Sequence, residues 1–106
     1  MRCWKYLTEF LRKLEPDRMP IISYFFGIVI TMRHNDHPPP HFHAEYQGFE
    51  AFIGIEQGEV LEGKLPRAAQ RVVREWALQH KEELQQNWEK ARRLMPLEMI
   101  PGADND

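Results

Sequence analysis

The chain has 106 residues, of which 42% are hydrophobic and 28% are charged, and its formal net charge is −2. This length suits one domain and excludes a large enzyme with a cofactor domain of its own. The composition is typical of a soluble globular protein, and the near balance of charge excludes a general polyanion binder, so nucleic acid is not an expected partner.

The first segment, residues 1–18, predicts a short amphipathic helix that forms an N-terminal extension. Its apolar residues recur at helical spacing, and they are Trp4, Leu7, Leu11 and Leu14. The chain has one cysteine, Cys3, so no internal disulfide can form. This cysteine usage fits a reducing compartment, and we expect a cytoplasmic protein.

After Pro20 the sequence changes to β-branched and aromatic residues, and alternating patterns predict an antiparallel sheet of three to four strands. The predicted strands are Phe25–Arg33, His41–Tyr46, Phe49–Ile55 and a brief fourth that begins at Val60 and ends at Gly63. The longest apolar run, Ile21–Met32, is too short to cross a membrane, which needs about 20 apolar residues. We therefore expect no membrane association.

One long helix is predicted from Pro66 to Met95, because proline suits a helix start and an apolar stripe continues until Pro96. The stripe consists of Val72, Val73, Trp76, Leu84, Trp88 and Ala91. A single apolar stripe needs one partner surface, and the sheet supplies it. The predicted fold is therefore α+β, a small antiparallel sheet with a long C-terminal helix packed on one face. Residues 19–100 would form this domain, followed by a loose acidic tail over 101–106.

Four of the five histidines lie between His34 and His43, and Asp36 lies among them. Imidazole is the commonest metal ligand in proteins, and a carboxylate adds an oxygen donor. We therefore predict a metal site formed by His41 and His43, with help from His37 and Asp36. The ion would be zinc or another divalent transition metal, because these ions prefer imidazole.

Strand geometry favours His41 and His43 as the central pair. Alternate residues of a strand point to the same face, with Cα atoms about 6.7 Å apart. If the first two strands pair with Arg33 near His41, both imidazoles project toward solvent, together with Glu45 and away from the helix. His80 lies instead on the apolar stripe of the helix, where a satisfied core histidine is expected.

The three prolines between His37 and His41 leave the role of His37 open. A straight polyproline II segment would separate the Cα atoms of the two histidines by about 12 Å. A shared ion would then need a bend or a cis prolyl bond. Alternatively, the prolines could pre-order the loop and hold Asp36 and His37 over the strand. A solvated polar sheet face that binds no metal would also explain the clustered histidines.

Several segments resemble the bacterial family catalogued as domain of unknown function 4160. They are MPIIS at 19–23, GIVI at 27–30, NDHPPPHFHA at 35–44 and LEGKLP at 61–66, and the match runs from Met19 to about Leu97. The resemblance implies a small α+β protein of the bacterial cytosol with no assigned activity. Members usually begin at the equivalent of Met19, so either Met1 or Met19 is the start. Members more often have an aromatic residue in place of His34, so His34 is not predicted as a ligand.

Three functions follow as hypotheses, and a binding role is favoured over a catalytic one. The first is a metal-binding accessory or regulatory module that uses the histidine cluster. The second is a protein-interaction partner in a toxin–antitoxin-like pair, because members of the family are often encoded beside another small protein. The third is a metal-dependent hydrolase or nuclease in which Glu45 or Asp36 acts as the base.

Overall fold

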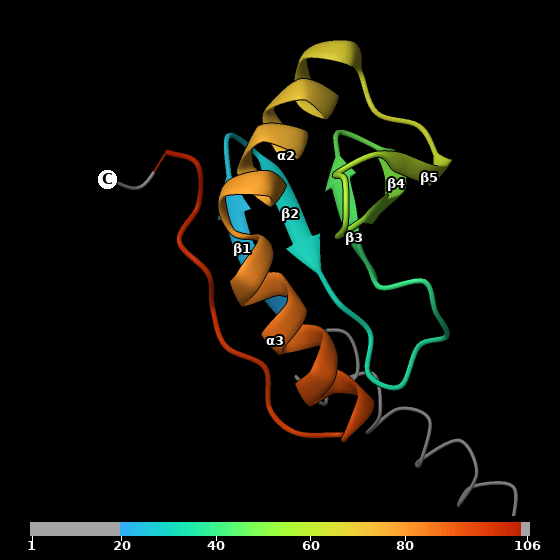
Figure 1. Ribbon diagram of the computed structural model, residues 1–106. Coiled ribbons are helices and arrows are strands. Elements are labelled where there is room, and N and C mark those ends of the chain that lie inside the picture. Colours follow the sequence, from blue (N-terminus) through green and yellow to red (C-terminus); the bar gives the residue numbers. More distant parts are fainter. Residues whose placement is uncertain (1–19, 105–106) are drawn as a thin grey trace, which may run out of the picture.

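The computed structural model describes residues 20–104 (Figure 1). The predicted helix over residues 1–18 lies outside the described residues. The described chain has an α+β fold in which five antiparallel strands form one sheet in the order β1-β2-β3-β4-β5. The strands are β1 (Ile21–Phe25), β2 (Ile28–Thr31), β3 (His41–Tyr46), β4 (Phe49–Gly54) and β5 (Val60–Gly63).

The prediction of one first strand over Phe25–Arg33 is wrong, because a tight turn divides this region into β1 and β2. Phe26 (φ 51°) and Gly27 (φ 78°) form the turn. Two consecutive residues with positive φ match the twist of a two-residue hairpin. The sheet therefore has five strands rather than three or four. A phenylalanine in the turn concealed it, because phenylalanine is typical of strands rather than turns.

The pairing of β2 with β3 has the register that the sequence analysis assumed. Thr31 lies opposite His43 and Ile30 lies opposite Ala44, so continuing the register brings Arg33 beside His41. The next connection is a turn at Gln47 and Gly48, in the gap between the predicted strands His41–Tyr46 and Phe49–Ile55. After it, β4 pairs with β3 along its whole length. This register keeps His41 and His43 on one face of the sheet and the apolar residues of β3 on the other.

The predicted long helix is two helices, α2 (Arg67–Gln79) and α3 (Lys81–Arg92). They follow one another along the same side of the sheet (Figure 1). His80 separates them with φ −111° and ψ 27°. The apolar stripe gave no sign of this break, because its period continues from Trp76 across the junction to Leu84. His80 is correspondingly not a core residue: it packs against the Trp76 ring and contacts the Glu83 carboxylate at the helix surface.

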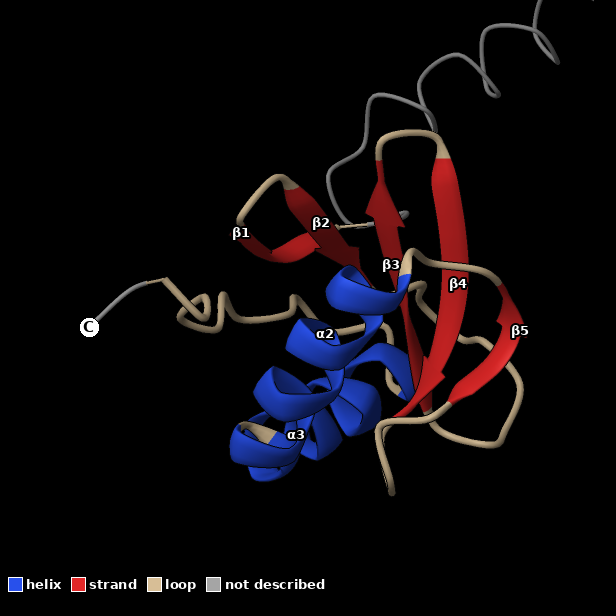
Figure 2. Ribbon diagram, turned by 90° about the horizontal axis from the view of Figure 1, so that it is seen from above, coloured by secondary structure: helices blue, strands red, loops and turns tan. Residues whose placement is uncertain are grey.

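The core lies between the sheet and the two helices, which cover one face of it (Figure 2). Ile30, Phe42 and Ile53 from the sheet are buried there. Trp76 of α2 packs edge-on against Phe42, with ring centroids 5.7 Å apart. Burying apolar surface of this kind is the main favourable term in folding. No helix in residues 20–104 is long and apolar enough to cross a membrane.

The segment that follows α3 returns along β1. Asn87, which is 2% exposed, donates to the carbonyl of Glu98 and accepts from its amide, both at 2.9 Å. Further on, the Ile100 amide donates to the Ile22 carbonyl at 2.7 Å. The Ser23 hydroxyl donates to the Ile100 carbonyl at 2.8 Å. These bonds hold the C-terminal segment against the outer edge of β1.

Candidate metal centre

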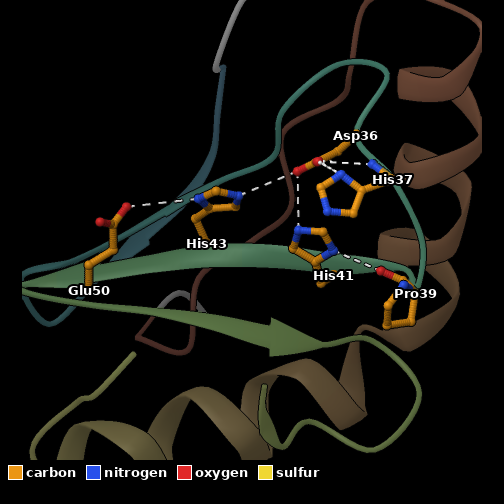
Figure 3. Close-up of polar contacts among 6 residues, drawn as sticks. All are labelled: Asp36, His37, Pro39, His41, His43 and Glu50. Atoms are coloured by element: carbon orange, nitrogen blue, oxygen red, sulfur yellow. Dashed lines mark hydrogen bonds and ion pairs between the residues drawn. The ribbon is translucent and has the colours of Figure 1, made fainter. Parts of the chain in front are cut away.

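The loop over residues 32–40 positions the candidate centre. It leaves β2 and folds back over the face of the sheet that includes His41 and His43 (Figure 3). Two contacts join this loop to the C-terminal end of the helical pair: the Asn35 amide donates to the Ala91 carbonyl at 3.0 Å, and His34 Nε2 donates to the Met95 carbonyl at 2.8 Å. His34 therefore anchors the loop.

Asp36 lies at the point where the loop passes over β3. Its Oδ1 atom accepts a hydrogen bond from the His37 amide at 2.9 Å. Its Oδ2 atom lies 3.1 Å from His41 Nε2 and 3.7 Å from His43 Nε2. One potential ligand atom from each of the three residues lies within 4.8 Å of the others. The structure thus brings three of the four predicted metal ligands together around one carboxylate oxygen.

His41 and His43 are buried rather than solvent-facing, so that expectation is wrong. They are 6% and 5% exposed. Phe52, opposite His43 in β4, covers both imidazoles, with ring centroids 4.2 Å from His43 and 5.6 Å from His41. Trp88 of α3 packs against His41, with ring centroids 5.4 Å apart. The prediction that the histidine face of the sheet points away from the helices is therefore also wrong at the His41 end of β3. Aromatic side chains and the Asp36 loop exclude solvent from the imidazoles.

The hydrogen bond made by His41 determines which of its nitrogens is free. Its Nδ1 atom lies 2.7 Å from the carbonyl oxygen of Pro39. A carbonyl can only accept, so Nδ1 carries the hydrogen, and in the neutral ring Nε2 then holds a lone pair. That lone pair points at Asp36 Oδ2, which is also an acceptor. Two acceptors at this distance require a positive group between them, either a proton or a metal ion.

His43 has no hydrogen-bond partner for either of its buried ring nitrogens among the described residues. Glu50 Oε2 is 3.8 Å from Nδ1, beyond hydrogen-bond range. A buried polar group without a partner is costly and rare in folded proteins. Burial, and secondly the positive charge at His41, lowers the pKa of His43. His43 is therefore neutral at neutral pH, and a neutral imidazole is the form that binds metals.

Asp36 is held in its ionised form. Burial acts to raise its pKa, but the hydrogen bond from the His37 amide and the positive charges at His41, His37 and Arg33 outweigh burial and lower the pKa overall. The centre thus combines one carboxylate with one neutral imidazole and one imidazole whose Nε2 is directed at that carboxylate. The carboxylate and the neutral imidazole are in the protonation states that metal binding requires.

Among the other predicted site residues, His37 lies outside the three-residue cluster. Its side chain is 89% exposed, and its Nδ1 atom lies 3.2 Å from Asp36 Oδ1. The Pro38-Pro39 peptide is cis, one of the two arrangements under which the sequence allowed His37 and His41 to approach. Their ring centroids are nevertheless 6.5 Å apart. Glu45 is exposed and lies opposite Glu50 of β4.

A cavity of about 220 Å³ adjoins the cluster. Asp36, His41 and His43 contribute to its lining. Arg33, Leu61 and Glu62 line it as well. Sequence reasoning did not predict a cavity here, because two of its lining residues come from β5, which joins the site through tertiary pairing with β4.

The stability of the metal-free protein should fall as the pH drops below about 6.5, the ordinary value for histidine. The pKa of His43 is lowered in the folded state, so between the two values the unfolded chain binds more protons and unfolding is favoured as the pH falls. The ordinary pKa of an aspartate is 3.8, and that of Asp36 is lowered in the folded state. Asp36 therefore destabilises the folded protein in the same direction, but only below about pH 3.8.

Urea unfolding midpoints measured across this pH range in the presence of a chelator test this prediction. His43→Gln removes the titrating ring and should flatten the profile below pH 6.5. Parallel profiles for the wild type and His43→Gln would show that His43 does not couple folding to protons.

The model for the family described as Domain of unknown function (DUF4160) matches residues 27–89, which is more than half of the chain. The matched range contains all three residues of the cluster. Comparisons with curated proteins and with solved structures gave no match.

Proposed function

This chain belongs to the DUF4160 family, and we propose that it is an accessory or regulatory module that binds one divalent transition-metal ion through Asp36, His41 and His43. One observation carries the proposal: two buried imidazoles direct their Nε2 atoms at a single carboxylate oxygen. The unpartnered ring nitrogens of His43 support it, because a metal ion would satisfy Nε2.

The separations of the donor atoms suit a small ion. Metal–nitrogen and metal–oxygen bonds of about 2.0–2.1 Å in a tetrahedral site place neighbouring donors about 3.3 Å apart. In the structure Asp36 Oδ2 lies 3.1 Å from His41 Nε2 and 3.7 Å from His43 Nε2. All three donor atoms lie within 4.8 Å of one another, and side-chain rotation would bring them to the spacing of donors around one ion.

The chemistry of the donors favours zinc or a similar transition metal. Calcium and magnesium prefer sites made of oxygen ligands, whereas two imidazoles and one carboxylate are found in zinc and iron(II) sites. Three protein ligands also leave a coordination position for a further ligand, unlike the four-ligand sites that only stabilise a fold.

The surroundings of His41 match those of metal-binding histidines in general. Such histidines usually donate their second ring N–H to a carbonyl or carboxylate, which fixes the ring and raises its basicity. The Pro39 carbonyl accepts that bond from His41 Nδ1. Glu50, 3.8 Å from His43 Nδ1, is the nearest carboxylate placed for the same role.

The cluster favours a metal-binding role over the role of a hydrolase. As a metal ligand, Asp36 would not be free to serve as the base that a hydrolase needs. Glu45, the other base proposed from the sequence, is exposed and does not line the cavity. A partnership with a protein encoded nearby, in a toxin–antitoxin-like pair, remains a prediction from the family resemblance alone.

Metal titration of the metal-free, untagged full chain tests the proposal. Calorimetry with Zn²⁺ should give one ion per chain with a Kd of about 1 µM or tighter, and elemental analysis should identify the ion that copurifies. Asp36→Asn keeps the shape and the acceptor for the His37 amide but removes the charge, so it should weaken binding by at least roughly tenfold. Failure of the wild type to bind any divalent ion at about micromolar concentration would refute the proposal.

A further inference from the structure

The cavity beside the metal cluster has the features of a ligand site. Its volume of about 220 Å³ is below the ~300–1,000 Å³ of pockets that hold drug-sized molecules, so its occupant must be small. Asp36, His41 and His43 all line it, and a metal ion held by three protein ligands keeps a coordination position for a further ligand. A small molecule in the cavity would therefore lie next to the ion.

Arg33 supplies a positive charge in the lining of the cavity. Its guanidinium has no acidic side chain within 4.0 Å among residues 20–104. Guanidinium and a transition-metal ion both bind carboxylates, the first through paired hydrogen bonds and the second through an oxygen–metal bond. The rest of the wall includes Phe52 and the half-exposed Leu61, which suit an aliphatic chain better than an ionic group.

We propose that this cavity binds a short aliphatic carboxylate, with one oxygen on the metal ion and the other on Arg33. The inference rests on the proposed metal site. With neutral imidazoles, Arg33, Asp36 and Glu62 give the cavity one excess negative charge, which a divalent ion turns into one excess positive charge. Binding of the carboxylate therefore requires the metal. The chain of the ligand lies against Leu61 and Phe52.

Cobalt(II) is the probe, because its visible absorption reports both its own binding and the arrival of a further ligand. The Co²⁺-loaded full chain is titrated with acetate, butyrate and inorganic phosphate. We expect a spectral change with both carboxylates, and affinity should rise by roughly threefold per added methylene because each becomes buried. Phosphate should bind more weakly than butyrate. The metal-free protein should not bind butyrate in calorimetry.

Two variants and one control locate the ligand. Arg33→Gln should weaken the binding of butyrate by roughly tenfold. Its affinity for Co²⁺ should stay within about twofold of the wild-type value. Leu61→Ala should remove most of the difference between acetate and butyrate. Arg67→Gln, which removes an exposed arginine of α2 that does not line the cavity, should change neither measurement.

The outcomes separate this inference from the proposed function. If no cobalt spectrum forms, the metal site and the carboxylate site are both refuted. If cobalt binds but its spectrum does not change when carboxylates are added, only the carboxylate site is refuted. The same holds if Arg33→Gln binds butyrate with the affinity of the wild type. Phosphate binding that exceeds butyrate binding would also refute it, because the apolar wall would then have no role.

Discussion

Replacing His41 and His43 together by alanine is expected to weaken Zn²⁺ binding by roughly a thousandfold or more, since loss of even an outer-shell partner costs about 10–100-fold. The variant would leave Asp36 as the remaining member of the cluster, and one carboxylate does not hold a transition metal against water. Competition with a chelating dye measures affinities over this range. Circular dichroism should confirm that the variant is folded.

The matched control removes two histidines that lie outside the cluster. His37→Ala with His80→Ala deletes the same number of imidazoles, and we expect its affinity for Zn²⁺ to stay within about tenfold of the wild type, because exposed charge pairs such as that of His37 with Asp36 contribute little. If alanine at the two buried positions prevents folding, His41→Gln with His43→Gln preserves much of the volume. Equal losses in the cluster and control variants would mean that zinc binds histidines without regard to the fold.

Gly63→Ala is expected to lower the free energy of unfolding by about 3 kcal/mol or more. Gly63 has φ +87°, a conformation that costs an alanine roughly 1–2 kcal/mol. An added Cβ would also overlap the carbonyl oxygen of Glu50 and lie 2.9 Å from the Cα of Ala51. That carbonyl accepts a hydrogen bond from the Lys64 amide at 2.9 Å, so it cannot move away freely. Urea denaturation measures the loss.

Gly48 supplies the control for this prediction. It has nearly the same backbone angle, φ +86°, but no atom lies within 4 Å of an added Cβ. Gly48→Ala should therefore show the conformational cost alone, about 1–2 kcal/mol. If both variants lose the same stability, the close approach of β4 to Gly63 has no energetic effect.

The sequence was sufficient for those parts of the fold that depend on local periodicity. The alternating patterns on either side of Gln47 and Gly48 predicted β3 and β4. The register that brings Thr31 opposite His43 agrees with the pairing assumed for Arg33 and His41. The turn at Phe26 and the helix break at His80 could not be predicted in this way. Each interrupts the backbone at a residue that does not interrupt the apolar pattern.

In the candidate centre too, local periodicity predicted some features, and contacts between distant segments determine the others. The two-residue period of β3 was enough to put His41 and His43 on one face. The position of Asp36 over them depends on the anchoring of its loop to the end of α3, as in the bond from Asn35 to Ala91. Burial of the imidazoles depends likewise on Phe52, which comes from another strand. Contacts between distant segments have no signature in local spacing, so the predicted solvent-facing pair is in fact enclosed.

The return of the C-terminal segment along β1 affects how copies of this protein can associate. An uncovered outer strand offers free amides and carbonyls on which a foreign strand can assemble, the first step toward fibrils. Here the Ile22 carbonyl is already occupied by Ile100, and the Phe26 amide donates to Asp104 at 3.3 Å. The chain thus shields this flank of its own sheet, and growth of an intermolecular sheet from β1 would first have to displace the segment that lies there.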